Sequence, residues 1–295
     1  MKVLIAGFTT KKFMPYLEKY IRVLQEENCE YDIIYMDREM DETSCRRGNE
    51  FFYFYKMPIE KKIWSKFLPY FGYMKYAGKI LRKGHYDKII FLTTAPAVLL
   101  FRNYLKKYAG NYILDYRDYT FEKIGVYQKL VKKIIRNSYA AFISSEGFKT
   151  FVGNDRKIHI THNISNLEEL SKHCGQKPEG KITIGFVGCV RYFDVNTRLI
   201  DCCSKRSDIE LLYAGTAYDD CNLKSYCEEK NIVNVSFIES FDNSEKRELY
   251  EKITFVNSIY SLKSPEVLQA VPNRLYDAAI FRKPILVSKG TFLEK

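Results

Sequence analysis

Short apolar runs alternate with longer amphipathic segments along both halves of this chain. In the first half the apolar runs predict strands at residues 2–6, 31–36, 88–92, 111–116, 140–144 and 157–161. Helical spacing between them predicts helices at residues 14–27, 97–108 and 125–138. Strands separated by helices indicate a parallel sheet with crossover helices.

The pattern restarts after a polar stretch, residues 166–181, which has weak periodicity and contains Gly175, Pro178 and Gly180. We predict that this stretch is a linker. Beyond it, strands are expected at residues 182–188, 209–214, 233–238 and 254–259, and helices at residues 223–230 and 244–252. The predicted fold is therefore α/β, with two Rossmann-like domains facing a cleft, at residues 1–165 and 182–295, and ligands at the carboxyl ends of the strands.

The last part of the chain, residues 271–288, predicts a turn, a helix that carries Asp277, and a buried strand. Lys283 and Pro284 mark the step into that strand. The chain ends soon afterwards, at Lys295. Because a complete domain of this kind has a further strand and closing helices, we expect the second domain to be incomplete.

Length and composition describe an ordinary soluble globular protein. A chain of 295 residues with 46% hydrophobic and 28% charged residues suggests about two domains. The eight cysteines include no C-x-x-C pair and the chain has only four histidines, so we expect reduced thiols and no metal site. The first apolar run is too short for a signal peptide, and no window approaches ~18 apolar residues. A cytoplasmic location is expected.

The chain is basic, with a formal net charge of +11, which attracts polyanions, anionic membranes or phosphorylated small molecules. Residues 61–83 contain no acidic residue, and their basic residues alternate with aromatic ones: Lys61, Lys62, Trp64, Lys66, Phe67, Tyr70, Phe71, Tyr73, Lys75, Tyr76, Lys79, Arg82 and Lys83. Two interpretations are open. The segment is either a peripheral contact with an anionic membrane, on the inner face of the plasma membrane, or an amphipathic helix packed on the first sheet. Nucleic acid is not expected, because no recognition motif accompanies the charge.

The predicted strand ends carry a series of short motifs. In the first half these are residues 87–96, residues 114–118 followed by Glu122, residues 143–145 and residues 162–164; in the second half they are residues 184–191, 213–215 and 272–288. Together, and in this order, they resemble GT-B glycosyltransferases, in particular the bacterial family-four enzymes that build capsules and O-antigens.

The resemblance implies transfer of a sugar from a nucleoside diphosphate to a lipid-linked or oligosaccharide acceptor, with retention of configuration and without a metal or other cofactor. It implies that the donor is bound by Gly188, Arg191, Gly215, Arg274 and Asp277. Glycine lets the backbone approach a phosphate, arginine neutralises the diphosphate, and Asp277 accepts hydrogen bonds from the ribose.

On the acceptor side the resemblance points to Gly7, Thr94 and Arg117, with Asp118 as the base for the acceptor hydroxyl. For Arg117, a buried ion pair with a carboxylate is the competing interpretation. For the donor residues, the competing interpretations are a strand-ending turn at Gly188, solvated arginines at 191 and 274, and an exposed helix carboxylate at Asp277.

Two departures from the family pattern keep a second function open. The loop at residues 192–196 contains no lysine, and Gln269 stands where the family often has the first of two acidic residues. A catalytically inactive relative that serves as a partner or scaffold is therefore the alternative. A GT-B-type sugar-nucleotide epimerase is a third interpretation, for which no set of acid and base carboxylates is recognisable.

Overall fold

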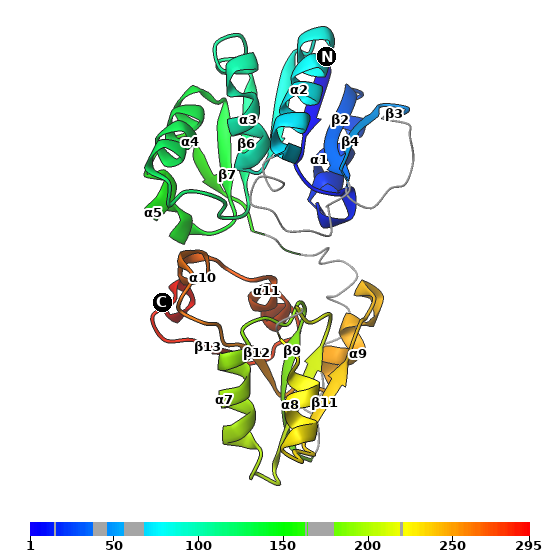
Figure 1. Cartoon of the computed structure of the whole chain (residues 1–295), viewed down its shortest axis with the longest axis vertical. Helices are drawn as coiled ribbons and strands as arrows, with labels where there is room; N and C mark the ends of the chain where they lie inside the picture. The colour runs from blue at the N-terminus through cyan, green and yellow to red at the C-terminus, as the bar shows by residue number, and fades with distance from the viewer. Residues whose placement is uncertain (15, 38–45, 56–67, 163, 165–179, 219–220) are drawn as a thin grey trace. The chain divides into compact units, whose positions relative to one another are not determined.

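The computed structural model describes residues 1–14, 16–37, 46–55, 68–162, 164, 180–218 and 221–295 (Figure 1). The chain divides into two compact units, Met1–His162 and Asn163–Lys295, called unit 1 and unit 2 below. The predicted linker lies almost wholly outside the described residues, as do residues 61–67 of the basic aromatic segment. Among the described residues, no helix is long and apolar enough to cross a membrane.

Unit 1 is built on an eight-stranded sheet with the order β3-β4-β2-β1-β5-β6-β7-β8. All neighbouring strands are parallel except β3 and β4, which are antiparallel. The strands are β1 (Lys2–Ala6), β2 (Glu30–Asp37), β3 (Arg46–Arg47), β4 (Glu50–Phe54), β5 (Lys88–Leu92), β6 (Tyr112–Tyr116), β7 (Ala140–Ile143) and β8 (Ile158–Ile160).

Helices cover both faces of this sheet. The chain moves in one direction along the sheet through α1 (Leu17–Glu26) and in the other through α2 (Leu68–Lys83), α3 (Thr94–Tyr104) and α4 (Gly125–Asn137). Because such crossovers are right-handed, α1 lies on one face, and α2, α3 and α4 lie side by side on the other (Figure 1). The shorter helical segments are η1 (Lys11–Phe13), η3 (Glu146–Phe148) and α5 (Lys149–Val152).

Unit 2 is built on a five-stranded parallel sheet with the order β11-β10-β9-β12-β13. Its strands are β9 (Ile182–Val187), β10 (Ile209–Ala214), β11 (Val235–Ile238), β12 (Phe255–Ser258) and β13 (Ile285–Val287). Its helices are α7 (Phe193–Cys203), α8 (Leu223–Glu229), η4 (Asn243–Glu245), α9 (Lys246–Glu251), α10 (Pro265–Gln269), α11 (Asn273–Ile280) and η5 (Phe292–Glu294).

The predicted strands and helices are all present, most of them within two residues of the expected bounds. The helix expected at residues 97–108 begins earlier, at Thr94, because Pro96 fits the first turn of a helix. The sequence patterns missed β3, β4, α7 and α10. One prediction was wrong: β13 is half-buried rather than buried, because it is the edge strand of its sheet.

Candidate functional site

Two glycines end neighbouring strands in unit 2. Gly188 follows β9 and Gly215 follows β10, with φ angles of 128° and 127°. A Cβ atom on Gly215 would lie 2.2 Å from the carbonyl oxygen of Gly188. No other residue fits at position 215 without moving the backbone, so the two strand ends are in direct main-chain contact.

The loop after Gly188 is held in one shape. Its residue Val190 exchanges main-chain hydrogen bonds with the loop after β10, donating to Thr216 at 3.0 Å and accepting from Tyr218 at 3.1 Å. The buried Asn196 side chain donates to the carbonyl oxygens of Arg191 at 2.6 Å and Tyr192 at 3.0 Å. This loop leads into α7, so the N-terminus of that helix follows the glycine pair, a favourable arrangement for an anion.

Arg191 is exposed, and its guanidinium lies over the ring of Tyr218, 4.6 Å from the ring centre. The contact holds the charge close to the loop after β10.

Arg274, on α11, is buried, with 6% of its surface exposed. The interpretation as a solvated arginine is therefore wrong. Its Nη1 donates to the carbonyl oxygen of Val187 at 3.3 Å, its Nη2 donates to the hydroxyl of Tyr260, and the guanidinium stacks 3.6 Å from the ring centre of Phe186. Burial lowers the pKa of Arg274.

The buried charge of Arg274 forms no ion pair with a carboxylate in the part of the chain that the structure describes, and its Nε has no hydrogen-bond partner there. A Cβ atom on Gly188 would stand 3.6 Å from Nη1, so the guanidinium lies directly against that strand end. Because a buried unpaired cation is costly, an anion at this point would stabilise the unit.

Asp277 lies one turn after Arg274 on α11 and is also buried, with 3% of its surface exposed. The interpretation as an exposed helix carboxylate is wrong. Its Oδ2 accepts hydrogen bonds from Lys246 Nζ at 3.2 Å and from the Tyr250 hydroxyl at 3.1 Å. Sequence reasoning did not find these two partners, which lie on α9, a helix that the pattern itself had predicted.

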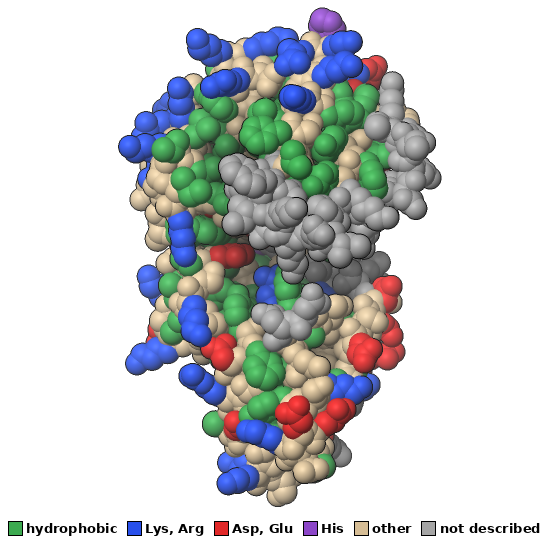
Figure 2. Space-filling model, viewed as in Figure 1, with side chains coloured by type: hydrophobic (Ala, Val, Ile, Leu, Met, Phe, Trp, Pro, Cys, Tyr) green, Lys and Arg blue, Asp and Glu red, His purple; other side chains and the backbone are tan. Residues whose placement is uncertain are grey.

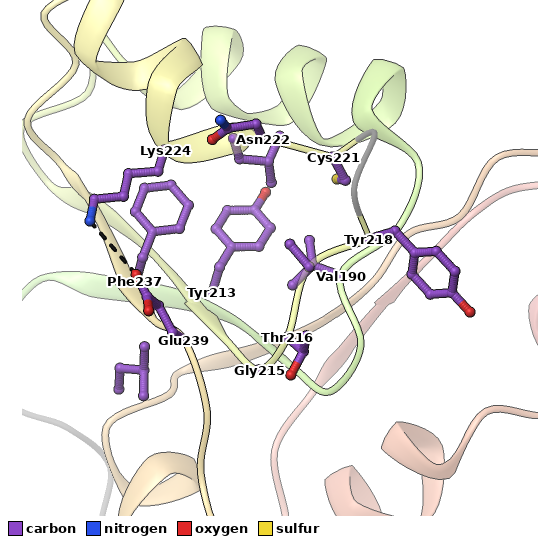
Figure 3. Close-up of a pocket in the computed structure, with 13 residues that line it drawn as sticks. Val190, Tyr213, Gly215, Thr216, Tyr218, Cys221, Asn222, Lys224, Phe237 and Glu239 are labelled. Atoms are coloured by element: carbon purple, nitrogen blue, oxygen red, sulfur yellow. Dashed lines mark ion pairs between the residues drawn. The ribbon is translucent and has the colours of Figure 1, made fainter. Parts of the chain in front are cut away.

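A cavity of about 380 Å³ opens at the carboxyl ends of β10 and β11. Figure 3 shows residues that line it, among them Tyr213 and Phe237, whose rings lie side by side, and Gly215 at the end of β10. Lys224 and Glu239 form an ion pair of 3.8 Å at its rim. The cavity therefore combines flat apolar walls with polar groups, and it shares Gly215 with the glycine pair.

In unit 1 the corresponding strand ends are filled by the chain's own side chains. A Cβ atom on Gly7 would lie 2.4 Å from the sulfur of Met14, and the Tyr73 hydroxyl donates to the carbonyl oxygen of Gly7 at 2.6 Å. Gly7 therefore makes room for the packing of Met14. Its role toward an acceptor stays a prediction.

Thr94 is buried in a polar cluster at the end of β5. The Tyr127 hydroxyl donates to Thr94 Oγ1 at 2.7 Å, and Thr94 Oγ1 lies 3.4 Å from Glu122 Oε1. The other oxygen of Glu122 accepts from the main-chain nitrogen of Thr120 at 2.6 Å, and burial raises the pKa of Glu122. Thr93, just before, has a φ of 77°, which is a strained conformation for threonine.

Arg117 belongs to a buried ion pair. Its Nε lies 2.6 Å from Asp115 Oδ1, and the Tyr20 hydroxyl donates to Asp115 Oδ2 at 2.8 Å. The competing interpretation of Arg117 is thus confirmed, and the pair ties α1 to the end of β6. Asp118 follows Arg117 and is exposed, where a substrate could reach it.

Comparison with known proteins gives no match by sequence: neither a protein-family model nor a curated protein is similar enough. By structure the chain is similar to a sucrose-phosphate synthase from Thermosynechococcus elongatus, with a TM-score of 0.68, 11% identity, and coverage of 100% of this chain and 82% of that one. The chain has the GT-B fold.

Two further GT-B structures are similar over almost the whole chain. One is the lipopolysaccharide outer core galactosyltransferase WaaB, with a TM-score of 0.64, 13% identity, and coverage of 99% of this chain and 81% of that one. The other is HepE from Anabaena, solved in complex with UDP and glucose, with a TM-score of 0.61, 12% identity, and coverage of 100% and 82%. The chain is shorter than the structures that it matches.

Proposed function

We propose that this protein is a glycosyltransferase, retaining and metal-independent, that moves a sugar from a nucleoside diphosphate to a lipid-linked or saccharide acceptor in bacterial surface-polysaccharide assembly. The observation that carries the proposal is the buried Arg274, which forms no ion pair with a carboxylate of the described residues and lies against the glycine at the end of β9. Its charge matches the diphosphate of a sugar nucleotide.

The donor fits unit 2 in three parts. The base takes the cavity at the carboxyl ends of β10 and β11, where the half-buried Phe237 offers an apolar lining. The diphosphate takes the ends of β9 and β10, where Gly188 and Gly215 have no side chains. Asp277 accepts hydrogen bonds from the ribose, and Lys246 holds that carboxylate in place. The bound UDP and glucose of the similar Anabaena protein support this class of donor.

The transfer step needs positive charge where the leaving group forms. The anomeric C–O bond breaks, negative charge grows on the departing diphosphate, and the acceptor oxygen forms the new bond to the sugar. Arg274 and Arg191 stabilise the diphosphate, since fixed cations in a site that excludes water act more strongly than solvent does. Asp118 takes the proton of the acceptor hydroxyl. Its exposure at the end of β6 supports this role.

A lipid-linked acceptor would bring the protein to the inner face of the plasma membrane from the cytoplasm. The predicted contact at residues 61–83 belongs to this part of the proposal, and Leu68–Lys83 is the portion of it that the structure describes.

Calorimetry with a panel of nucleoside diphosphates tests the donor site. We expect one of them to bind, and Asp277→Asn and Arg191→Ala to weaken its binding by about tenfold each, the effect of one hydrogen bond to a charged group. Arg274→Gln should weaken it more. Arg198→Ala, which removes an exposed arginine from α7, is the matched control and should bind normally.

Failure of every nucleotide to bind the wild-type chain would overturn the proposal. Binding without turnover of any nucleotide sugar would instead favour the catalytically inactive relative, the alternative that the lysine-free loop at residues 192–196 leaves open.

A further inference from the structure

The helix layer formed by α2, α3 and α4 contains no aspartate or glutamate. Its basic residues, with those of the loop after α3, are Lys75, Lys79, Arg82, Lys83, Arg102, Lys106, Lys107, Lys129, Lys132, Lys133 and Arg136. All of them are exposed except Lys132, which is half-buried. Figure 2 shows lysine and arginine side chains gathered over this part of unit 1.

These charges are not balanced within the described part of the chain. No carboxylate there forms an ion pair with any basic residue of the layer. The opposite face of the same sheet differs, because α1 contains Glu18, Lys19, Arg22 and Glu26. The excess of positive charge therefore lies on one face of unit 1. This basic face extends beyond the predicted segment at residues 61–83.

One end of this layer carries exposed apolar side chains. Leu68 and Phe71 lie at the start of α2, with 60% and 59% of their surfaces exposed, and Ile124 and Val126 lie at the start of α4, with 57% and 78% exposed. The ring of Phe121, in the loop before α4, lies 6.3 Å from that of Tyr70 on α2. The two helix starts are therefore neighbours and form one apolar rim.

We infer that the outer face of this layer docks on an anionic phospholipid bilayer, with the apolar rim entering the lipid headgroup region. The basic residues match the negative surface of the bilayer, each contributing about 1 kcal/mol near it. The rim favours a bilayer over nucleic acid as the polyanion. Burying apolar side chains in a bilayer is favourable, whereas a phosphate backbone offers them no apolar environment. The inference rests on the proposed function in one respect only: a lipid-linked acceptor gives the protein a reason to be at the bilayer.

Vesicle flotation of the full chain tests the inference, with phosphatidylcholine vesicles and with vesicles that also contain phosphatidylglycerol. We expect binding to the anionic vesicles only. Replacing Lys79, Lys129 and Lys133 together by glutamate should weaken partitioning at least on the order of a hundredfold, roughly fivefold for each lysine lost. The matched control replaces Lys205, Lys252 and Lys289 of unit 2, which are also exposed, and should bind as the wild type does.

The rim is tested separately with Ile124→Ser combined with Val126→Ser, against Val233→Ser, which removes from unit 2 an apolar side chain that is even more exposed, at 94%. The rim variant should lose the part of the binding that survives high salt, because salt screens the charges and leaves apolar insertion. Equal loss in the two lysine triples, or binding to duplex DNA but not to anionic vesicles, would overturn the inference.

Nucleotide calorimetry on the same variants keeps the two proposals apart. The layer and rim variants should bind nucleoside diphosphates normally. A chain that binds nucleotide but no vesicle contradicts the docking inference alone, and a chain that binds vesicles but no nucleotide contradicts the donor site alone.

Discussion

The carboxyl ends of the strands are built in opposite ways in the two units. In unit 1 the chain's own side chains fill them: Met14 packs against Gly7, Arg117 pairs with Asp115, and Tyr127 bonds to Thr94. In unit 2 two glycines end the strands, a cavity adjoins them, and the buried Arg274 forms no ion pair with any carboxylate that the structure describes. A strand end that pairs its own buried charges supports the fold, whereas one whose buried charge has no ion-pair partner among the described residues is prepared for a ligand.

The largest expected effect is at the strand ends of unit 1, which the chain's own side chains fill. Arg117→Met leaves the buried Asp115 without its cation, which should cost about 3–5 kcal/mol in the free energy of unfolding. Adding Asp115→Asn should recover much of the loss, because the uncompensated charge is then gone. Urea unfolding measures both.

The control for Arg117→Met is Arg206→Met in unit 2. Arg206 pairs with Asp208 at 2.7 Å, almost the same distance as the 2.6 Å of the Arg117 pair. Unlike that pair, however, both Arg206 and Asp208 are exposed. Little change is expected there, since exposed pairs are screened by water. If the two variants lost equal stability, burial would not be what gives the Arg117 pair its weight.

In unit 2, Gly215→Ala should lower the free energy of unfolding by about 3 kcal/mol. Part of this is the strain of a positive φ, about 1–2 kcal/mol, and the rest is the overlap of the new Cβ atom with the carbonyl of Gly188. Gly110→Ala is the matched control, because Gly110 has a φ of 75° and nothing within 4 Å of the added atom. It should lose only the strain term. The comparison is made by urea unfolding, and equal losses would mean that the contact between the strand ends is not tight.

The smallest effect concerns pH and the polar cluster at Thr94. Because burial raises the pKa of Glu122 in the folded state above its ordinary 4.5, the folded state favours the protonated form. This contribution to stability is present below pH 4.5 and is lost as the pH rises through the folded-state pKa. Glu122→Gln should therefore be more stable than the wild type at pH 7, with a difference that closes towards pH 4. A difference in unfolding free energy that stays constant with pH would contradict the assignment.

The sheets could be predicted from the sequence, because their strands are buried on both faces and appear as unbroken apolar runs. Strands β5 and β10 have the predicted bounds for this reason. Strand β4 begins with Glu50 and follows residues of mixed polarity, and α7 contains Asp194, Asn196 and Asp201, so neither gave a clear period.

The candidate site was predictable in position but only partly in environment. The motif that carries Arg274 and Asp277 was recognised, yet their burial depends on Phe186, Tyr260, Lys246 and Tyr250, which come from other elements. No local pattern reports such contacts. The Arg117 pair was closer to hand, since Asp115 stands two residues earlier in the chain and side chains at that spacing share one face of a strand.

The contact between Gly188 and Gly215 also bears on the free energy that a ligand would spend on binding. Because main chain touches main chain, with no side chain to rotate between them, the two strand ends keep their spacing whether a ligand is bound or absent. A ligand that enters there spends none of its binding free energy on arranging this part of its site. This part of the site in unit 2 is therefore preformed before a ligand binds.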